Sequence, residues 1–336
     1  MAWTENVSLR KYNTFGIEAG ARHFSIFSSA EELASLLNQS PRPLIILGGG
    51  SNILLTGDID GWVLINGIGG IDLVHEDDRY FYVQAGAGES WHGFVEHCLD
   101  RDWAGVENLS LIPGSVGAAP MQNIGAYGVE LKEVFHELEA WDLQDGKVRM
   151  FTLNDCRFGY RDSVFKSEYK GRFIILSVTF RLHRDPVFHT GYGAIREELT
   201  RMNIRDLSIR AISEAVVRIR TAKLPDPAVI GNAGSFFKNP TIPNEQFAAL
   251  KARFADIVGY PGPTGGVSKL SAGWMIEQCG WKGYRRGDAG CHDRQALVLV
   301  NYGHATGREI YDLSEDILRS VQQQFGVTLE REVNII

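Results

Sequence analysis

Paired cysteines are missing from this sequence. The four that it has, Cys98, Cys156, Cys279 and Cys291, lie far apart and form no CxxC motif. That spacing argues against a zinc site or a disulfide framework and indicates a reducing compartment. His292 has no second histidine or carboxylate at a helical interval, so a structural role suits it better than metal ligation. We therefore predict no metal centre.

Long apolar runs, an excess of positive charge and a secretion signal are missing too. No apolar run approaches the ~18 residues that a membrane span needs, and "MAWTENVSLRKYNTFG" lacks the basic-then-apolar order of a signal peptide. The formal net charge is -7, so no overall basic field favours nucleic acid or an anionic membrane. We expect a cytoplasmic protein without a nucleic-acid partner, membrane insertion or an obligate protein partner. Local groups must then bind any anionic ligand.

Neither a GxGxxG nor a GxxxxGK[ST] phosphate-binding motif occurs in the chain. The strand-like run "PLIIL" is followed instead by the glycine turn "GGGSN" at 48–52. Backbone N–H groups of consecutive small residues can form an anion-binding nest there, and a plain tight turn is the alternative. A second stretch, "LIPGSVGAAPMQNIGAYG" at 111–128, is long and irregular, with Gln122 and Asn123 as amide donors and acceptors. Its small residues favour close approach of a large flat ligand over a compact surface loop.

The 336 residues suggest two or three domains, and the 44% apolar content is ample for packed cores. Apolar spacing predicts helices over 30–38, 89–101, 206–220, 244–257, 272–279 and 308–326. Ser29 and Glu32 form a capping box at the start of the first, and Gly326 ends the last. Alternation predicts strands over 80–88 and 327–336. Helices and short strands mix without a regular βαβ order, so the fold class is α+β, with a boundary near residue 223.

Three further stretches carry reactive or charged side chains. In "GNAGSFFKNP" (231–240), Ser235 follows small residues and precedes two Phe, which suggests a backbone close to a ligand rather than a plain turn. In "RFGYRDSVFK", Arg161 stands beside Asp162, and a solvated ion pair is the alternative to a functional role. In the C-terminal strand, Glu330 and Glu332 share the polar face, which faces either water or a cleft.

In order along nearly the whole chain, these motifs resemble the UDP-N-acetylenolpyruvoylglucosamine reductase family, flavoenzymes that make UDP-N-acetylmuramate for peptidoglycan. The motifs are "NTFG" (13–16), "ILGGGSN" (46–52), "AGAGESWHGFV" (85–95), "ENLSLIPGSVGAAPMQNIGAYGVEL" (107–131), "CRFGYRDSVFK" (156–166), "KLPDP" (223–227), "GNAGSFFKNP" (231–240), "SAGWMIEQCG" (271–280), "HDRQALVLVN" (292–301) and "LEREV" (329–333). The stretch "TGYGAIREEL", with Tyr192, is similar to the insertion of the family's type I branch.

The resemblance implies a fold and a reaction. The fold is a PCMH-type (vanillyl-alcohol-oxidase-like) FAD-binding fold of two α+β subdomains, with a smaller α+β domain for the substrate. We assign the first subdomain to 1–68, completed by 327–336, the second to 69–222 and the substrate domain to 223–326. In the family's reaction, hydride passes from NADPH to noncovalently bound FAD, and then from N5 of the reduced flavin to the enolpyruvyl CH2 carbon. The adjacent carbon is then protonated.

The resemblance also implies the catalytic residues. Arg161 and Glu332 stabilise the carboxylate of the enolate-like intermediate that hydride addition creates. Glu332 acts as a protonated donor, which requires a raised pKa. Ser235 gives the proton to carbon, and the small residues before it let its hydroxyl stand close to flavin and substrate.

Two sets of binding residues are implied in the same way. Arg220 lies by the flavin pyrimidine edge, where positive charge favours the anionic reduced flavin. The other FAD contacts are Gly48, Gly49, Gly50, Ser51, Asn52, Ile112, Pro113, Gly114, Gln122, Asn123, Gly125, Ala126 and Tyr127. The substrate contacts are Lys223, Asn239 and Tyr192 at the UDP diphosphate, and Gln295 and Tyr160 on the sugar side.

Two other functions are weighed against this one. A PCMH-type alcohol oxidase or dehydrogenase is the first, and many of these attach FAD covalently through His or Cys. Neither residue occurs in 48–52 or 112–128, which indicates noncovalent FAD. A UDP-sugar sensor without chemistry is the second, and it would need no set such as Arg161, Ser235 and Glu332. Arg331 and Asn334 depart from the family's usual residues beside Glu332.

Overall fold

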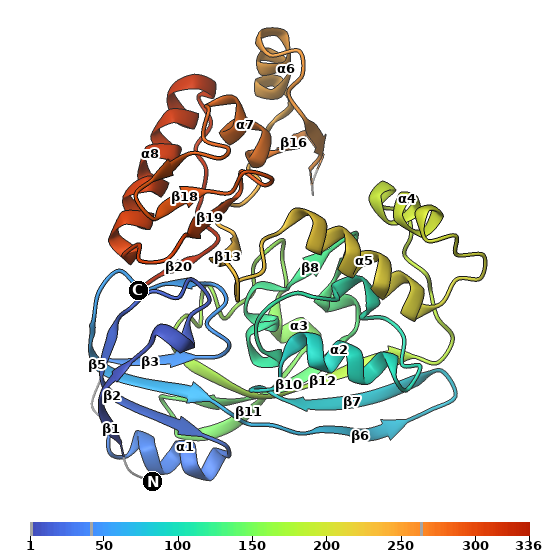
Figure 1. Cartoon of the computed structure of the whole chain (residues 1–336). Helices are drawn as coiled ribbons and strands as arrows, with labels where there is room; N and C mark the ends of the chain where they lie inside the picture. The colour runs from blue at the N-terminus through green and yellow to red at the C-terminus, as the bar shows by residue number, and fades with distance from the viewer. Residues whose placement is uncertain (1–2, 41–42, 263–264) are drawn as a thin grey trace. The chain divides into compact units, whose positions relative to one another are not determined.

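The computed structural model describes residues 3–40, 43–262 and 265–336, which group into two units (Figure 1). Unit 1 contains residues 3–7, 22–40, 43–49 and 60–222. Unit 2 contains residues 8–21, 50–59, 223–262 and 265–336. The chain passes between the units several times, so each unit is built from stretches that are distant in sequence. The three-part division into 1–68 with 327–336, 69–222 and 223–326 stays a prediction.

Unit 1 contains two main sheets (Figure 1). The first has the order β1-β2-β5-β3, from β1 (Thr4–Ser8), β2 (Gly20–Phe27), β3 (Leu44–Leu47) and β5 (Ile59–Asn66), with β3 and β5 parallel. The second is antiparallel with the order β11-β10-β12-β7-β6, from β6 (Ile71–Glu76), β7 (Tyr80–Gly86), β10 (Phe135–Asp142), β11 (Lys147–Thr152) and β12 (Phe173–His183). A small hairpin joins β8 (Gly125–Ala126) to β9 (Val129–Glu130).

Helices cover these sheets by burying aromatic and aliphatic side chains. The rings of Trp91 and Phe94 lie 5.8 and 4.5 Å from that of Phe180 in β12, and all three are buried. Burial of such large rings is the main stabilising contribution to this core. The helices of unit 1 are α1 (Ala30–Leu37), α2 (Trp91–Leu99), α3 (Leu153–Cys156), α4 (Gly193–Arg201) and α5 (Ile209–Lys223), with short 3-10 turns η2 (Glu107–Leu109), η3 (Val116–Ala118), η4 (Pro120–Gln122) and η5 (Leu131–Glu133).

Unit 2 packs one long amphipathic helix, α8 (Gly307–Phe325), against α7 and the strands β18 and β19 (Figure 1). Apolar side chains three or four residues apart form its buried face: Ile310, Leu313, Ile317, Val321 and Phe325. The main sheet has the order β13-β19-β18-β17, from β13 (Gly231–Ser235), β17 (Arg285–Arg286), β18 (Ala289–Cys291) and β19 (Val298–Asn301). The other elements are η1 (Arg10–Tyr12), β4 (Ile53–Leu54), β14 (Thr241–Pro243), α6 (Asn244–Arg253), β15 (Gly259–Pro261), β16 (Val267–Leu270), α7 (Ala272–Gln278) and β20 (Asn334–Ile335).

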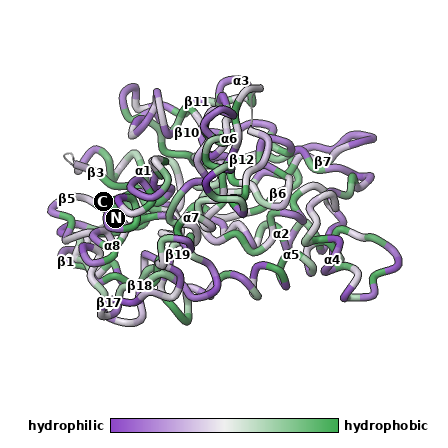
Figure 2. Tube along the Cα trace, turned by 90° about the horizontal axis from the view of Figure 1, so that it is seen from above, coloured by the Kyte–Doolittle hydropathy of each residue, from purple (hydrophilic) through white to green (hydrophobic). Residues whose placement is uncertain are grey.

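The predicted α+β class and the six predicted helices are confirmed. Ser29 Oγ accepts a hydrogen bond from the Glu32 N–H, as the capping box predicts. The Glu32 carboxylate reaches the N–H of Ser28, one residue before the predicted partner. Gly326 ends α8 in the left-handed conformation, with φ 67°. Figure 2 shows hydrophobic and hydrophilic residues alternating closely along the chain, and no described helix is long and apolar enough to cross a bilayer.

The continuous strand predicted over 327–336 is wrong. Only Asn334–Ile335 forms a strand, β20, which pairs in parallel with β4, and Arg331 forms an isolated bridge with Phe237. Val327, Leu329 and Val333 are buried as the alternation predicts, while Ile335 is 37% exposed. The pattern therefore predicted the burial of three of these four apolar side chains, but the backbone of this segment forms isolated hydrogen bonds instead of a regular ladder.

Asn13, in the "NTFG" motif, organises a buried turn of unit 2. Its side chain is 6% exposed, donates to the carbonyls of Leu9 and Ile17 and accepts from the Ile17 N–H, each at 2.9 Å. We expect Asn13→Ala to destabilise the protein by about 3 kcal/mol, because it leaves several buried backbone groups unpaired. Urea unfolding followed by tryptophan fluorescence measures this change. The exposed Asn38, replaced in the same way, is the control, and an equal effect of both substitutions would contradict the prediction.

Candidate active site

Two glycine-rich loops of unit 1 lie in direct backbone contact. A Cβ atom at Gly48 would be 2.4 Å from Ser115 Oγ, and one at Gly49 would be 3.0 Å from the Gly114 Cα. Side chains at these glycines would push the loops apart, so the small residues keep two predicted FAD-binding stretches side by side. Gly114 has φ 118°, which favours glycine as well. The glycines therefore fix the close approach of the two loops, and the FAD contacts of these loops stay a prediction.

The second half of the nest, Gly50–Asn52, belongs to unit 2. Gly50 has φ 61°, and a Cβ there would lie 2.0 Å from the carbonyl oxygen of Tyr12. Its own carbonyl accepts from the Thr14 N–H at 3.1 Å. The next residues hold the C-terminal segment: Asn52 Nδ2 donates to the Glu332 carbonyl at 3.3 Å, and the Asn334 amide donates to the Asn52 carbonyl at 3.0 Å. The nest residues thus fix the backbone on which Glu332 stands.

Two guanidinium groups lie close together in unit 1. Arg220, on α5, donates to the Leu111 carbonyl at 3.1 Å and also hydrogen-bonds Tyr127. Burial lowers the pKa of Arg220, Tyr127 opposes that effect, and the nearby Arg161 lowers the pKa further. Arg161 has φ 54° and donates to the Gly125 carbonyl at 2.6 Å, which directs its side chain toward the 111–128 loop. A buried cation with a second cation beside it suits an anionic group, as the FAD and carboxylate assignments require.

Asn123 is held by the protein itself. Its side chain is fully buried, donates to Glu130 at 3.1 Å and to the Gly159 carbonyl at 3.0 Å, and accepts from the Lys132 N–H at 3.1 Å. These bonds occupy the side-chain amide and tie the loop to the segment just before Tyr160. A cofactor contact of Asn123 stays a prediction, and its observed role is to shape the loop.

Asn108, which no motif singled out, is a further buried residue of this region. It is 1% exposed, and its Nδ2 donates to the carbonyls of His189 and Tyr127 at 2.9 and 3.3 Å. It thereby joins the 111–128 loop to the segment of Tyr192, whose ring meets that of Tyr127 edge-on at 5.4 Å. Glu107 beside it is also 1% exposed, and burial raises the pKa of its carboxyl. The sequence signal that could have identified this pair is the occurrence of two adjacent polar residues in the otherwise apolar and small run "ENLSLIPG".

Unit 2 brings Ser235 and Glu332 together. Ser235 ends β13, and the N–H of Glu332 donates to the carbonyl of Phe236, the next residue, at 2.8 Å. Both residues are half-buried. Among the residues that the structure describes, none forms a hydrogen bond with the Ser235 hydroxyl, which leaves that hydroxyl available to a substrate. Arg161, the third predicted catalytic residue, belongs to unit 1.

The predicted substrate contacts divide between the units in the same way. Tyr160 and Tyr192, in unit 1, have exposed fractions of 38% and 53%. In unit 2, Asn239 Oδ1 accepts from the first N–H of α7 at 3.0 Å, and Gln295 Oε1 accepts from the Leu297 N–H at 3.3 Å. Both amides keep donor hydrogens that these bonds do not use. Lys223 is exposed at the end of α5, where a flexible cation can reach a diphosphate.

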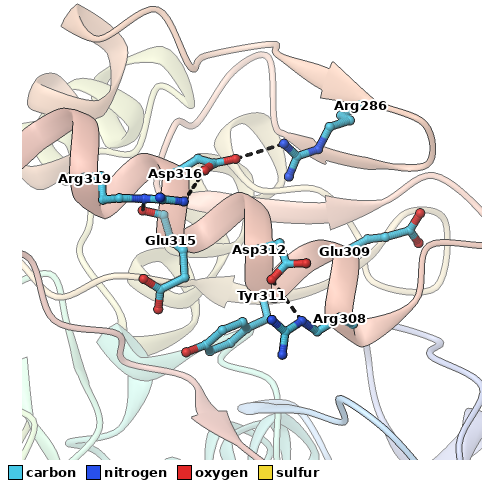
Figure 3. Close-up of a pocket in the computed structure, with 8 residues that line it drawn as sticks. All are labelled: Arg286, Arg308, Glu309, Tyr311, Asp312, Glu315, Asp316 and Arg319. Carbon is cyan, nitrogen blue, oxygen red and sulfur yellow. Dashed lines mark hydrogen bonds and ion pairs between the residues drawn. The ribbon is translucent and has the colours of Figure 1, made fainter.

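A surface depression of about 660 Å³ along α8 contains none of the predicted site residues (Figure 3). Its arginines are already paired: Arg286 and Arg319 with Asp316 at 2.9 and 2.6 Å, and Arg308 with Asp312 at 3.0 Å. Arg331 joins the same network, bonding Ser314 at 2.8 Å and Glu315 at 2.5 Å. The departure at residue 331 therefore adds a contact with α8.

Comparisons with known proteins cover nearly the whole chain. Residues 23–152 match a family described as "FAD binding domain", and residues 226–336 match "UDP-N-acetylenolpyruvoylglucosamine reductase, C-terminal domain". The chain is 51% identical over 335 residues to UDP-N-acetylenolpyruvoylglucosamine reductase of Amoebophilus asiaticus, covering 99% of this chain and 98% of the relative. It is 52% identical over 332 residues to the protein of that name from Pseudomonas syringae pv. tomato, covering 98% and 97%. A crystal structure of UDP-N-acetylenolpyruvylglucosamine reductase from Thermus caldophilus shares its fold, with TM-score 0.70, 24% identity and 99% of both chains covered.

Proposed function

Because the chain belongs to the UDP-N-acetylenolpyruvoylglucosamine reductase family and contains an FAD-binding domain, we propose that it reduces the enolpyruvyl group of UDP-N-acetylglucosamine enolpyruvate to give UDP-N-acetylmuramate. It is an FAD-containing oxidoreductase, and the proposed electron donor is NADPH. The observation that carries this proposal is the available Ser235 hydroxyl on the strand whose next residue bonds the Glu332 backbone. We place the reaction in the cytoplasm, without nucleic acid, membrane insertion or an obligate protein partner.

FAD held by the 48–52 and 111–128 loops would, once reduced, supply hydride to the CH2 carbon of the enol ether. The chain's own residues then stabilise the negative charge on the substrate carboxylate and donate the proton to the adjacent carbon. Arg161 and Glu332 donate hydrogen bonds to the substrate carboxylate, where negative charge develops, and so stabilise the enolate-like intermediate. Ser235 protonates the adjacent carbon. An alcohol is a weak acid, so this step depends on a strongly basic intermediate and on close placement of the hydroxyl.

Binding of the UDP part is assigned to a second set of residues. Lys223, Asn239 and Tyr192 hold the diphosphate, and Gln295 and Tyr160 line the sugar. Lys223 is a mobile cation, and the other residues of this set are uncharged. Such local contacts can bind the UDP part although the net charge of -7 gives no general attraction for anions. Binding energy from the UDP part helps to position the enolpyruvyl group for reaction.

An alcohol oxidase of related fold is the alternative enzyme, and its discriminating feature is how it treats oxygen. We expect the purified protein to be yellow, and anaerobic NADPH to bleach its flavin absorbance. Reoxidation should require the enolpyruvyl UDP-sugar and be slow with oxygen. Stopped-flow absorbance of the two half-reactions measures both properties. A colourless protein, or rapid turnover with oxygen, would count against the proposal. A protein that binds the UDP-sugar without reoxidation would favour the sensor alternative.

A further inference from the structure

Strand β13 is interrupted just before Ser235. Its pairing with β19 is regular at Gly231↔Asn301 and Asn232↔Val300, and it resumes at Ser235↔Val298. Three steps along β13 thus match two along β19, which is a β-bulge with one extra residue. Side chains alternate between the two faces of a strand, so one extra residue moves every later side chain to the opposite face. The bulge therefore decides which face of the sheet the Ser235 hydroxyl occupies.

The backbone of the bulge depends on Gly234. Its φ is 68°, a conformation in which glycine is favoured, and a Cβ there would have no atom within 4 Å. The space beside the bulge is therefore open within the described structure.

A buried amide holds this bulge in place. Asn232 is 2% exposed, and its Oδ1 accepts from the Gly234 N–H at 2.9 Å. Its Nδ2 donates to the carbonyls of Ile230 and Pro225 at 2.8 and 3.2 Å. One side chain thus fastens the residue before Ser235 to the segment that leads into the strand. Its backbone is fixed as well, because the Asn232 N–H donates to the Thr14 carbonyl at 3.0 Å.

We propose that Asn232 is the positioning residue of Ser235: its side-chain amide sets the bulge at Gly234 that aims the Ser235 hydroxyl at the carbon to be protonated. Asn232 itself touches neither substrate nor cofactor in this scheme. The inference rests on the proposed function, since it takes Ser235 as the proton donor. Removing the amide should let the bulge relax, and a hydroxyl misplaced by about 1 Å can lose about 10²-fold in rate.

Asn232→Ala, prepared as the FAD-loaded enzyme, tests the proposal. We expect flavin reduction by NADPH to stay within about twofold of wild type. Reoxidation by the enolpyruvyl UDP-sugar should slow by about 10²-fold, with a larger solvent deuterium isotope effect, because proton transfer becomes rate-limiting. On the Ser235→Ala background the same substitution should cause no further loss, since residues that act through one another are not additive.

Asn301→Ala is the matched control. Asn301 is also buried, lies on the neighbouring strand and uses its amide to hold the Phe15 carbonyl and the N–H groups of Gly303 and Ala305. It should lower the thermal midpoint without slowing reoxidation selectively. If Asn232→Ala does not fold, Gly234→Ala serves as the substitute test. It strains the bulge while keeping Asn232, and it should show the same selective loss of reoxidation.

The outcomes separate the inference from its premise. A normal reoxidation rate in Asn232→Ala, with Ser235→Ala slowed, overturns the positioning role alone. Additive losses in the double variant, or equal losses in both half-reactions, overturn it too. Normal reoxidation in Ser235→Ala removes the proposed proton donor and, with it, this inference.

Discussion

Ser235→Ala should leave flavin reduction by NADPH nearly unchanged and slow the second half-reaction by about 10²–10⁴-fold, the usual contribution of a positioned acid. The reason is that hydride transfer from NADPH to the flavin does not involve the hydroxyl, whereas net reoxidation by the substrate requires protonation of the adjacent carbon. Single-turnover stopped-flow absorbance of the two half-reactions separates these steps. Product formed in D2O, analysed by mass spectrometry, shows whether the carbon still takes its hydrogen from an exchangeable source.

Ser268→Ala is the control for this substitution. Ser268 is a buried serine of the same unit, it lies in β16 of a different sheet from β13, and its hydroxyl bonds Asn244 at 2.8 Å. It should leave both half-reactions unchanged. Equal slowing of both half-reactions in Ser235→Ala would remove Ser235 from the proton-donor role, because only the second step uses the proton.

Glu332→Ala should slow reoxidation by the substrate by about 10²–10³-fold, comparable with the loss of one hydrogen-bond donor to a developing oxyanion. Glu332→Gln should lose clearly less, because the glutamine amide still donates a hydrogen bond where a protonated carboxyl would. Rates of the second half-reaction for both variants, at saturating substrate, measure the difference. Flavin reduction by NADPH should remain close to wild type in each.

Glu330 offers a matched control two residues away. Its side chain is 73% exposed and pairs with Lys238 at 3.1 Å. Glu330→Ala should leave the rate of reoxidation unchanged. If Glu332→Gln is as slow as Glu332→Ala, the donor role of a protonated carboxyl is wrong, and a carboxylate role takes its place.

The helices were predictable from the sequence because their signals are local. In α8 the apolar spacing, together with Gly326 as the terminating residue, sufficed. The C-terminal strand failed for a physical reason. Its buried side chains alternate, but its backbone forms isolated hydrogen bonds instead of a regular ladder. One example is the bond from the Lys238 N–H to the Glu330 carbonyl. A pattern of burial does not specify which backbone groups pair.

The predicted site, too, has features that a local sequence pattern reveals and features that it does not. The glycine loops were recognised from composition, and their close approach at Gly48 and Gly114 depends on the absence of side chains. Arg161 and Arg220 are close in space but far apart in the chain, and so are the residues that Asn108 joins by its hydrogen bonds. No local pattern encodes such contacts. The catalytic roles came only from the family resemblance, and they remain proposals.

Thr14 links two features of unit 2 through main-chain atoms. Its N–H donates to the carbonyl of Gly50 in the nest, and its carbonyl accepts from the N–H of Asn232 at the bulge. Any amino acid supplies that carbonyl, and every one except proline supplies the N–H. Tolerance of side-chain exchange at this position would therefore say little about its structural importance. A one-residue deletion in the "NTFG" segment, by contrast, would disconnect the nest from the strand of Ser235.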